Sequence, residues 1–314
     1  PQSKESIVIG AHGDHLGRGD VGNSLAKNNE VGQIHYGADD NASGVAGVLE
    51  LAHFYSQKMK VAPLTIKKRI HFAVWSGEEL GNLGSSHFLK KHSKFKPEAY
   101  INMDMIGRYK QNIYIQGVGS ANEWRGLVEK LALNSPLSIS VESDPYLPTD
   151  SMSFYLAGVP TVSFFTGSHG EYHSPRDTPD LVNFEKTSDI IELVKNLSEE
   201  LAGSSQRVVQ YKKVATEERK LQGRGFRVYL GTVPDYTQEG VRGVRISGTS
   251  EGSPAHKSGL KEKDIIIEFN KLKIENMYDL VYALQAALPS KPTTIKVLRE
   301  NKEQEFQIVP MLKE

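Results

Sequence analysis

The strongest constraint on the fold is the alternation of strand-like and helix-like segments between residue 6 and about residue 202. Short apolar runs rich in β-branched residues, which favour strands, occur at Ser6–Ala11, His71–Ser76, Ala99–Met103, Asn112–Gln116 and Thr161–Phe165. Segments with apolar residues at helical spacing lie at Ala42–Ser56, Asn122–Leu133 and Phe184–Leu201. This alternation predicts an α/β fold, in which a mostly parallel mixed sheet is covered by helices in a three-layer sandwich.

Composition excludes several classes of function. The chain has 314 residues, with 38 basic and 38 acidic side chains and no cysteine. Such balanced charge gives no general reason to expect a nucleic acid or an anionic membrane as a partner. No apolar run approaches the ~20 residues of a membrane-spanning helix. Without cysteine, disulfides and thiol nucleophiles are excluded, and any metal must be held by His, Asp or Glu.

The character of the sequence changes after residue 202. The segment Gly203–Gln222 is polar, charged and weakly periodic, and we interpret residues 203–221 as a linker. One clear helix follows near Met277–Leu288. Short strand-like runs surround it, at Val241–Ser247, Asp264–Phe269, Thr294–Leu298 and Glu305–Val309. We therefore predict a first domain over residues 1–202 and a small β-rich domain over residues 222–314.

Residue types that bind metals are unusually dense in five short segments of the first region. Four of the segments follow a predicted strand and the fifth precedes a predicted helix. They carry His12 and Asp14, Asp39 and Asp40, Glu78 and Glu79, Asp104, and His173. Each segment taken singly is most simply a turn or a helix start. The joint pattern favours one shared site, because the carboxyl ends of neighbouring parallel strands meet at one edge of a sheet.

The chemistry of such a site follows from its charge. Six acids and two histidines gathered in one place need divalent cations to neutralise them. Zinc suits imidazole and carboxylate ligands, and two zinc ions ~3.5–4 Å apart form a known hydrolytic device. A further carboxylate must accept the proton of the attacking water, so we expect one of the adjacent glutamates not to bind metal. We also expect the carboxylate of Asp14 to accept the second ring N–H of His12.

The ordered segments AHGDH, GADDNASG, SGEELG, NMDMIG, TDSMSF and YHSPRDT resemble the M28 family of di-zinc peptidases, which includes bacterial aminopeptidases. The resemblance covers about residues 6–202. It implies two Zn²⁺ per chain and five ligands, without settling which ligand binds which ion: His12, Asp40, Glu79, Asp104 and His173. It also implies that Asp40 bridges the ions and that Glu78 is the general base. The family has a cis peptide after the bridging aspartate, so we predict a cis bond between Asp40 and Asn41.

Four further residues near these segments are candidates for lesser roles. The hydroxyl of Tyr172, next to His173, is a candidate to stabilise the developing oxyanion, and simple packing is the equal alternative. Asp150 recurs in the family pattern, and we expect it to support the site. His15 and His169 flank the implied ligands, and we expect each to be solvated or to contact a ligand rather than to bind zinc.

The beginning of the chain departs from the family pattern. Members normally carry further chain before the first metal-bearing strand, whereas only five residues precede Ser6 here. We therefore expect an N-terminal part of the catalytic domain to lie outside this sequence. The chain starts with Pro1 and shows no secretory segment. Relatives of this architecture are commonly exported, so we expect a periplasmic, cell-surface or secreted protein.

The second region resembles a bacterial-type PDZ domain over roughly residues 223–312. The run SPAHKSGLKEKDII predicts a short helix, a turn at Gly259 and a strand after Asp264. PDZ domains accept an extended peptide as an added strand and hold its C-terminal carboxylate with backbone N–H groups. The resemblance implies that Leu230 and Gly231 form this carboxylate-binding loop. A PDZ fold used only for packing or autoregulation is the alternative.

Our leading hypothesis is a zinc-dependent exopeptidase, an aminopeptidase, in which two metals activate water and Glu78 transfers the proton to the leaving amine. A carboxypeptidase on the same scaffold would need arginines facing the zinc ions, and Arg108 and Arg176 are nearby in sequence. A cyclising acyltransferase with one zinc is disfavoured by the retained Asp104. A non-catalytic peptide-binding protein is disfavoured by the complete ligand set.

Overall fold

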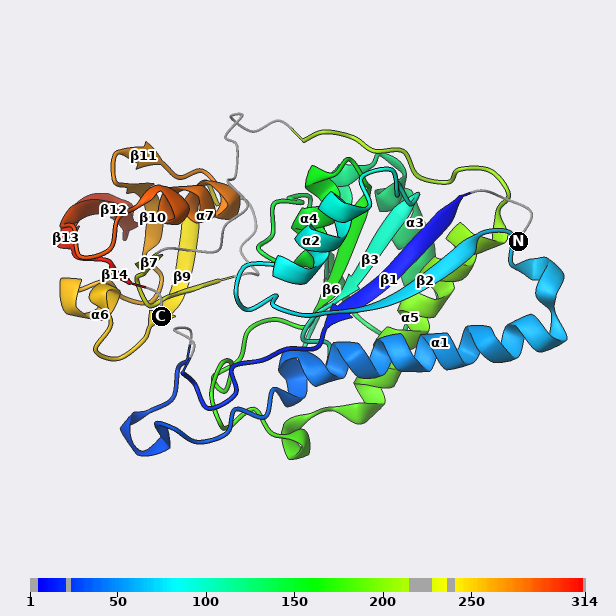
Figure 1. Ribbon diagram of the computed structural model, residues 1–314, viewed down its shortest axis with the longest axis horizontal. Coiled ribbons are helices and arrows are strands. Elements are labelled where there is room, and N and C mark those ends of the chain that lie inside the picture. The colour runs from blue at the N-terminus through cyan, green and yellow to red at the C-terminus, as the bar shows by residue number, and fades with distance from the viewer. Residues whose placement is uncertain (1–4, 21–23, 215–227, 236–240, 313–314) are drawn as a thin grey trace.

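The structure, a computed structural model, describes residues 5–20, 24–214, 228–235 and 241–312. These residues form a larger α/β unit and a smaller β-rich unit (Figure 1). Residues 215–221 of the expected linker and residues 222–227 at the expected start of the second domain lie outside the described residues. No helix in the described ranges has both the length and the apolar character needed to cross a bilayer.

A six-stranded sheet in the order β2-β1-β3-β6-β4-β5 forms the centre of the larger unit. Its strands are β1 (Ser6–His12), β2 (Arg69–Trp75), β3 (Ala99–Met103), β4 (Ile113–Gln116), β5 (Ile139–Val141) and β6 (Thr161–Phe165). The first four strands in this order run parallel, and β4 pairs antiparallel with β6 and parallel with β5. The predicted mostly parallel mixed sheet is therefore confirmed.

Helices cover both faces of this sheet (Figure 1). They are α1 (Gly44–Val61), α2 (Leu83–Lys91), α3 (Glu123–Ala132), α4 (Asp150–Leu156) and α5 (Phe184–Gly203). Helix α5 packs against α1 and α3 on one side of the sheet, while α2 packs against α4 on the other. Short 3₁₀ turns occur at Asn28–Glu30, Pro63–Thr65, Val118–Ser120 and Pro179–Leu181. The predicted three-layer sandwich is confirmed.

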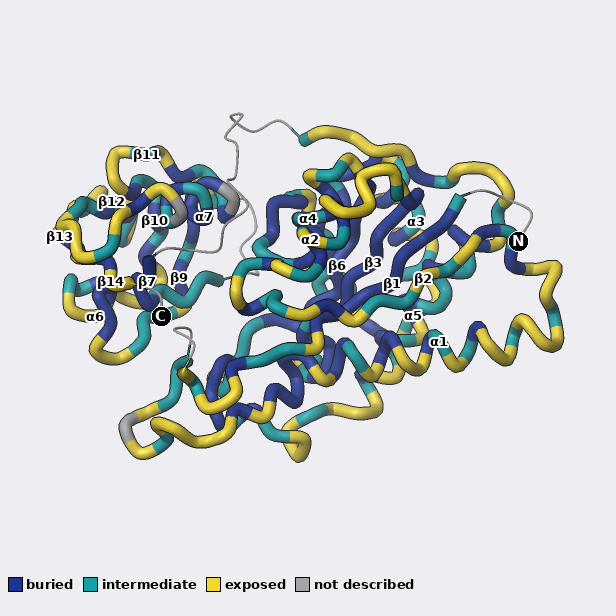
Figure 2. The backbone as a smooth tube through the Cα atoms, viewed as in Figure 1, coloured by how far each residue is buried: buried dark blue, intermediate teal, exposed yellow. Residues whose placement is uncertain are grey.

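The core lies between the sheet and its helices, and it fixes the strand ends that carry the site. Ile7, Ile9 and Ile101 are all 0% exposed, and burying each aliphatic side chain of this size stabilises the fold by roughly 1.5–3 kcal/mol. Figure 2 shows the same concentration of buried backbone in the central strands. The register places His12 beside Trp75, so the residues that follow β1 and β2 emerge together at one edge.

A buried ion pair ties the segment after α5 to the larger unit. Lys68 Nζ lies 2.5 Å from Glu98 Oε2, and both side chains are 0% exposed. Glu98 Oε1 also accepts the backbone N–H of Val208 at 2.5 Å. Farther along, Lys212 donates its backbone N–H to the carbonyl of Ser120 at 2.7 Å. The described part of the expected linker therefore runs against the larger unit rather than away from it.

Replacing Glu98 by Gln should destabilise the protein by about 3–5 kcal/mol, because it leaves the Lys68 ammonium buried without its counter-charge. The loss is measurable by urea unfolding. Glu200→Gln is the matched control, since it breaks the exposed pair with Lys130, whose side chain is 62% exposed against 40% for Glu200. That control should cost less than about 1 kcal/mol. Equal losses in the two variants would contradict this view of the Lys68 pair.

The smaller unit contains a sheet in the order β13-β12-β10-β9-β8, with β11 pairing with β10 and β7 pairing with β14. Its strands are β7 (Val228–Tyr229), β8 (Thr232–Pro234), β9 (Val244–Thr249), β10 (Ile265–Phe269), β11 (Leu272–Lys273), β12 (Thr293–Arg299), β13 (Lys302–Ile308) and β14 (Met311–Leu312). Its helices are α6 (Pro254–Ser258) and α7 (Met277–Ala286). It has its own apolar core, in which Ile266, Phe269 and Val297 are 0% exposed.

The short helix, the turn and the strand predicted from SPAHKSGLKEKDII are all present. Ser253 caps α6 by accepting the backbone N–H of His256, and Pro254 occupies its first turn, where a missing N–H costs nothing. Gly259 ends the helix with φ of 87°, a left-handed conformation that glycine adopts without a steric penalty. Strand β10 then begins at Ile265, directly after Asp264.

Candidate metal centre

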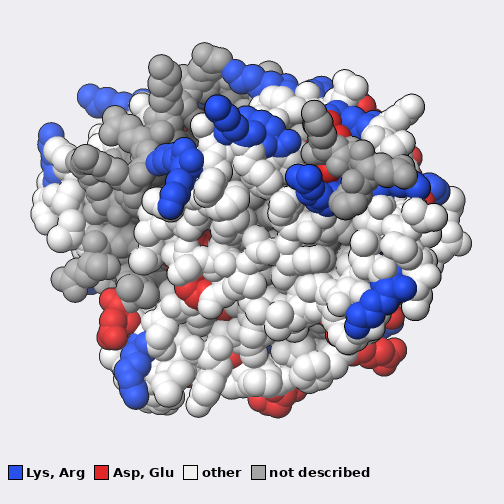
Figure 3. Space-filling view, turned by 45° about the vertical axis from the view of Figure 1, so that its right-hand side comes forward, with Lys and Arg blue, Asp and Glu red and all other residues white. Residues whose placement is uncertain are grey.

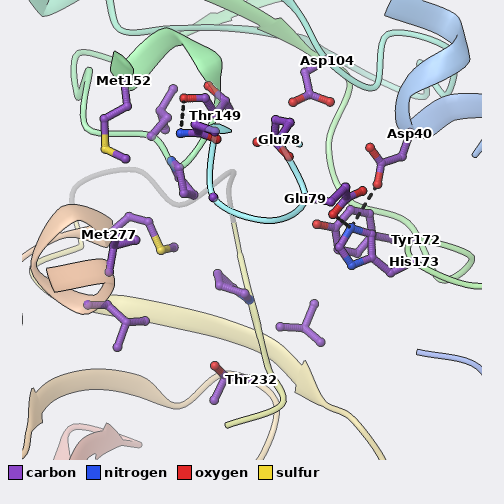
Figure 4. Close-up of a pocket in the computed structure, with 18 of the residues that line it drawn as sticks. Asp40, Glu78, Glu79, Asp104, Thr149, Met152, Tyr172, His173, Thr232 and Met277 are labelled. Atoms are coloured by element: carbon purple, nitrogen blue, oxygen red, sulfur yellow. Dashed lines mark hydrogen bonds and ion pairs between the residues drawn. The ribbon is translucent and has the colours of Figure 1, made fainter. Parts of the chain in front are cut away.

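The five side chains implied as ligands line one pocket at the carboxyl edge of the central sheet. Figure 4 labels four of them, Asp40, Glu79, Asp104 and His173. His12 is the last residue of β1, and Asp104 directly follows β3. Glu79 lies in the turn after β2, and His173 lies in the loop after β6. Asp40 sits in an irregular, kinked segment, Ala38–Ser43, immediately before α1. The parallel strands therefore bring together residues that lie far apart in the sequence.

These side chains form two groups that share Asp40. His12 Nε2 lies 3.2 Å from Asp40 Oδ1 and 3.4 Å from Asp104 Oδ1. His173 Nε2 lies 3.1 Å from Asp40 Oδ2 and 3.1 Å from Glu79 Oε2. Each oxygen of the Asp40 carboxylate thus faces a different histidine. This geometry groups His12 with Asp104 and His173 with Glu79.

The protonation of the cluster reflects its burial and its charges. His12, Asp40 and His173 are 2%, 3% and 6% exposed. Burial works to lower the pKa of His173, but the facing carboxylates of Glu79 and Asp40 raise that pKa to about 10. Burial works to raise the pKa of Asp40, but hydrogen bonds from His12 and His173 hold that pKa well below its usual range. The two imidazoles and the carboxylates that face them therefore stabilise one another's charged forms.

The donor set fits zinc. His12, Asp40 and Asp104 each offer one ligand atom, and these atoms lie within 4.8 Å of one another. Across both groups the donors are two imidazole nitrogens and three carboxylates, which are ligand types that zinc takes in hydrolytic sites. The two oxygens of Asp40, directed to the two groups, suit a carboxylate shared by a pair of ions.

Glu78 stands beside the two groups. Glu78 lies in the turn after β2, next to Glu79. One of its carboxylate oxygens lies within 4.8 Å of the possible ligand atoms of His12 and Glu79. Burial raises the pKa of Glu78 well above its usual range, the charge of His12 opposes the rise, and Glu79 and Asp104 add to it. Its carboxylate forms no ion pair with another described side chain. It is therefore placed to exchange a proton with a molecule held between the groups.

The structure corrects the role expected for Asp14. The backbone oxygen of Asp14, not its carboxylate, lies within hydrogen-bond distance of His12 Nδ1, at 3.1 Å against 3.9 Å for Oδ1. The carboxylate instead accepts the backbone N–H groups of Glu78 at 3.1 Å and Glu79 at 3.3 Å. The prediction was wrong because the turn after β1 brings the main chain closer to the ring. Asp14 fixes the turn that carries the two glutamates.

Buried polar groups hold Asp40 in place. The peptide bond between Asp40 and Asn41 is cis, as predicted. Asp177 accepts the backbone N–H groups of Asp39 and Asp40 at 2.9 and 3.0 Å, and Asn41 donates to the carbonyl of Met103 at 3.0 Å. Reasoning from the sequence missed Asp177, although it lies four residues after His173 in the segment YHSPRDT.

The carboxylate of Asp39 faces away from both groups. It is 0% exposed and accepts the backbone N–H of Gly107 at 2.6 Å. His169 Nε2 lies 3.1 Å from Asp39 Oδ2, and His169 Nδ1 lies 3.3 Å from Glu171 Oε2. Arg108 in turn donates to Glu171 at 2.7 Å. Asp39 and His169 therefore support the turn before α1 and join neither ligand group.

His15 is closer to the site than its flanking position suggested. Its side chain is 11% exposed, and its Nδ1 lies 3.0 Å from Glu79 Oε1 and 3.7 Å from Asp40 Oδ2. Of the two expectations for His15, a solvated ring or a contact with a ligand, the structure supports the contact. His15 is also a further candidate metal ligand, because it forms a third compact group with Asp40 and Glu79.

Tyr172 and Asp150 complete the surroundings. The ring of Tyr172 stacks on His173, with ring centroids 3.7 Å apart, and Tyr172 lines the pocket above the ligands. Its role at the oxyanion stays a prediction. Asp150 is the first residue of α4 and is 1% exposed. Burial raises the pKa of Asp150 to about 7. The charge of His12 opposes this rise and the charge of Asp104 adds to it.

The site opens into a pocket whose charge is acidic. Its charged and imidazole-bearing lining residues are His12, Asp40, Glu78, Glu79, Asp104 and His173. No Lys or Arg belongs to the lining that the described residues form. On the face shown in Figure 3, basic side chains are scattered around a broad uncharged surface in which small acidic areas are visible. This arrangement favours cations and ammonium groups over anions near the ligands.

Comparisons with known proteins identify relatives of this chain. The family model described as peptidase family M28 matches residues 1–198, and a model described as a PDZ domain matches residues 193–309. A probable leucine aminopeptidase of Arthroderma benhamiae is 29% identical over 211 residues, which cover 64% of this chain and 55% of the relative. Aminopeptidase YwaD of Bacillus subtilis is 28% identical over 175 residues, which cover 50% of this chain and 36% of that protein. The chain thus spans only part of the length of these curated relatives.

Solved structures share the fold. The LapA aminopeptidase of Legionella pneumophila matches with a TM-score of 0.54 and 22% identity, covering 65% of this chain and 53% of that one. The glutaminyl cyclase of Porphyromonas gingivalis matches with a TM-score of 0.52 and 19% identity, covering 64% of this chain and 74% of that one. Likeness at this identity concerns the fold and does not select between their activities. With a family match over more than half of its residues, the chain belongs to peptidase family M28, and it carries a PDZ domain in its C-terminal part.

Proposed function

We propose that the protein is a zinc-dependent aminopeptidase that removes residues from the amino end of peptides. The observation that carries this proposal is the pair of ligand groups sharing Asp40, with Glu78 beside them and outside both. Membership of peptidase family M28 supports the reaction class. Relatives named as aminopeptidases support the choice of the amino end.

The proposed cofactor is a pair of zinc ions. His12, Asp40 and Asp104 would hold one ion, and His173, Asp40 and Glu79 would hold the other. Zinc in these positions would polarise the scissile carbonyl and lower the pKa of a water molecule between the groups. Asp14, through its hydrogen bonds to the turn after β2, keeps Glu78 and Glu79 oriented toward the site.

Glu78 is the proposed general base. As the water attacks the carbonyl carbon, the Glu78 carboxylate accepts the proton of that water. When the C–N bond breaks, Glu78 donates the same proton to the nitrogen of the leaving amine, so the glutamate returns to its starting state. The hydroxyl of Tyr172, held by stacking on His173, is proposed to donate a hydrogen bond to the developing oxyanion.

The charge of the pocket favours an aminopeptidase over a carboxypeptidase. The free carboxylate of a carboxypeptidase substrate would need a basic partner near the ligands, and the lining contains no described Lys or Arg. A free amine needs no such partner. Arg108 and Arg176, the arginines considered for a carboxypeptidase, are engaged elsewhere. Arg108 donates to Glu171 at 2.7 Å, and Arg176 pairs with Glu30. Neither lines the pocket.

We also propose that the PDZ domain binds the carboxyl end of a peptide at Leu230 and Gly231. Among the described residues, the backbone N–H groups of this loop have no hydrogen-bond partner. Both carbonyls of the loop are already used, by Ala255 and Ser250 at 2.8 Å each. Strand β8 follows directly and lies at the end of the sheet order, so its outer edge can accept an added strand.

Leucine-containing peptides with a free or an acetylated amino end test the proposed function. The zinc-loaded protein should cleave the free peptides and should cleave their acetylated forms more slowly by ~10²-fold or more, because acetylation removes the free amine that an aminopeptidase recognises. A zinc chelator should abolish cleavage, and added zinc should restore it. Preferential cleavage of acetylated peptides would favour the carboxypeptidase. Absence of any cleavage by the zinc-loaded protein would favour a non-catalytic peptide-binding protein.

A further inference from the structure

The candidate metal centre and the PDZ groove line one and the same pocket. On the PDZ side the lining comes from the loop at Leu230 and Gly231, from β8, and from α7. On the other side it comes from the ligands, from Glu78 and from the segment Leu147–Met152. Figure 4 shows Met152 and Met277 on either side of a common space, with Thr232 of β8 beyond them. The groove between β8 and α7 therefore opens into the same space as the candidate ligands.

We propose that the two ends of one short peptide occupy this pocket at the same time. The amino end lies at the metal ligands, and the carboxyl end lies at the backbone N–H groups of Leu230 and Gly231. This inference rests on the proposed aminopeptidase function and adds a substrate class to it: short peptides with a free carboxyl end. The PDZ domain then selects substrates for the catalytic site.

The loop at Gly231 is built for close approach of a ligand group to the main chain. Gly231 has a φ of +74°, a conformation that L residues rarely adopt, and a Cβ there would lie 2.2 Å from Cβ of Ser253. Glycine is therefore required for this backbone path. The carbonyls of Leu230 and Gly231 are tied to α6 and to Ser250, so the N–H groups are the part of the loop left for a ligand. Successive backbone N–H groups of this kind bind carboxylates.

The stretch between the two ends of the pocket is mainly apolar. On α7 it presents Met277, Leu280, Val281 and Leu284, and on the opposite wall Leu147, Pro148 and Met152. Such walls can cover the side chains of a peptide that extends along the free edge of β8. The acidic side chains of the lining are thus gathered at the end that carries the candidate ligands, and the backbone N–H groups of Leu230 and Gly231 lie at the other end. This polarity complements a peptide with a free amine and a free carboxylate.

A pocket that binds both ends of one peptide predicts a preferred peptide length. An extended peptide spans at most about 3.3–3.6 Å per residue, so only a narrow range of lengths reaches from the ligands to Gly231. A shorter peptide leaves one end unbound, and a longer peptide must bulge. The turnover of a series Leu-(Ala)n-Leu should therefore pass through a maximum at one length, and amidation of the carboxyl end should remove that maximum.

Binding to the Glu78→Gln variant, loaded with zinc, tests the carboxyl end without turnover. Calorimetry should show that the free-acid peptide of preferred length binds about tenfold or more tightly than its amide, since hydrogen bonds to a charged group are lost on amidation. Leu284→Asp, placed on the same background, should remove this preference because it puts a negative charge in the groove. Leu272→Asp is the matched control: both leucines are partly buried against the same core, but Leu272 does not line the pocket. Circular dichroism establishes that both variants are folded.

The outcomes separate this inference from the proposed function. Cleavage of leucine p-nitroanilide, which has no carboxylate, reports the aminopeptidase reaction by itself. If that substrate is cleaved but acid and amide peptides bind equally, the shared-pocket inference is overturned and the proposed function stands. If acid peptides are preferred without any optimum of length, the groove serves a separate partner, and the inference is again overturned. If neither leucine p-nitroanilide nor any peptide is cleaved, the proposed function fails, and the inferred substrate class fails with it. Tighter binding of acid peptides with an optimum of length would then still support a pocket shared by both ends of a peptide, and equal binding of acid and amide would overturn it.

Discussion

Replacing Glu78 by Gln should lower kcat by about 10²–10⁴-fold, because the amide cannot accept the proton of the attacking water. The change preserves the shape of the side chain. Glu78 belongs to neither of the two groups that share Asp40, so zinc binding should remain at the level of the unmodified protein. The variant therefore separates loss of proton transfer from loss of metal.

Steady-state rates with leucine p-nitroanilide and zinc analysis of the same sample provide the measurement. Glu50→Gln, an exposed glutamate of α1 in the same unit, is the control and should change neither rate nor zinc content. Wild-type turnover in the Glu78 variant would show that another group is the base. Loss of zinc together with activity would show that Glu78 is a ligand.

Replacing Asp40 by Asn should have the second large effect, which falls on metal binding itself. Each oxygen of Asp40 faces a different histidine, at 3.2 Å for His12 and 3.1 Å for His173. Substitution therefore damages both groups, whereas Asp104→Asn damages only the group that contains His12. We expect Asp40→Asn to lose both ions and essentially all turnover, and Asp104→Asn to lose one ion.

Equilibrium dialysis followed by elemental analysis measures the ions per chain in the two variants. Thermal unfolding gives an independent reading, because zinc that binds the folded state raises Tm. The rise should vanish in Asp40→Asn and persist in reduced form in Asp104→Asn. Equal zinc contents in the two variants would contradict the shared position of Asp40.

Much of the site could be predicted from the sequence because it depends on local signals repeated along one sheet. His12 is the last residue of β1, and Asp104 directly follows β3, which pairs with β1. Glu79 follows β2, which pairs parallel with β1 on its other side. The carboxyl ends of such strands meet at one edge. A metal-binding residue placed just after each strand is therefore brought to a common point by the topology itself.

The contacts that orient these residues could not be predicted, because they join distant segments through the main chain. Asp177 accepts the N–H of Asp39 across 138 residues of sequence, and no local pattern marks such a bond. The role of Asp14 was misjudged for a related reason. Which of its oxygens reaches His12 depends on the path of a turn, and the residue types in AHGDH do not determine that path.

Elements with weak periodicity were also missed. Helix α4 has only 7 residues, and β5 has 3, which is too few for a helical or strand period to be recognised. Helix α2 was not predicted either, since its sequence LGSSHFLKK mixes small, polar and apolar residues. By contrast, the long apolar stripe of α5 begins at Phe184 as predicted and ends at Gly203, close to the expected Leu201.

The position of the PDZ domain relative to the candidate metal centre could not be predicted from the sequence. Its fold was recognisable, because the signals around Gly259 and Asp264 act over a few residues. The closeness of Leu230 to the metal ligands depends on how two separate hydrophobic cores are arranged. In that arrangement residues of both candidate sites line a single pocket.

The central claim is that two metal ions share one carboxylate between two histidine-containing groups. Anomalous X-ray diffraction at the zinc edge, on crystals grown with zinc, tests it most directly. The account predicts two zinc peaks per chain, one bound by His12 and Asp104 and the other by His173 and Glu79, each about 2.0–2.2 Å from its ligand atoms, with Asp40 contacting both. A single zinc peak, or peaks that leave Asp40 without metal, would contradict it.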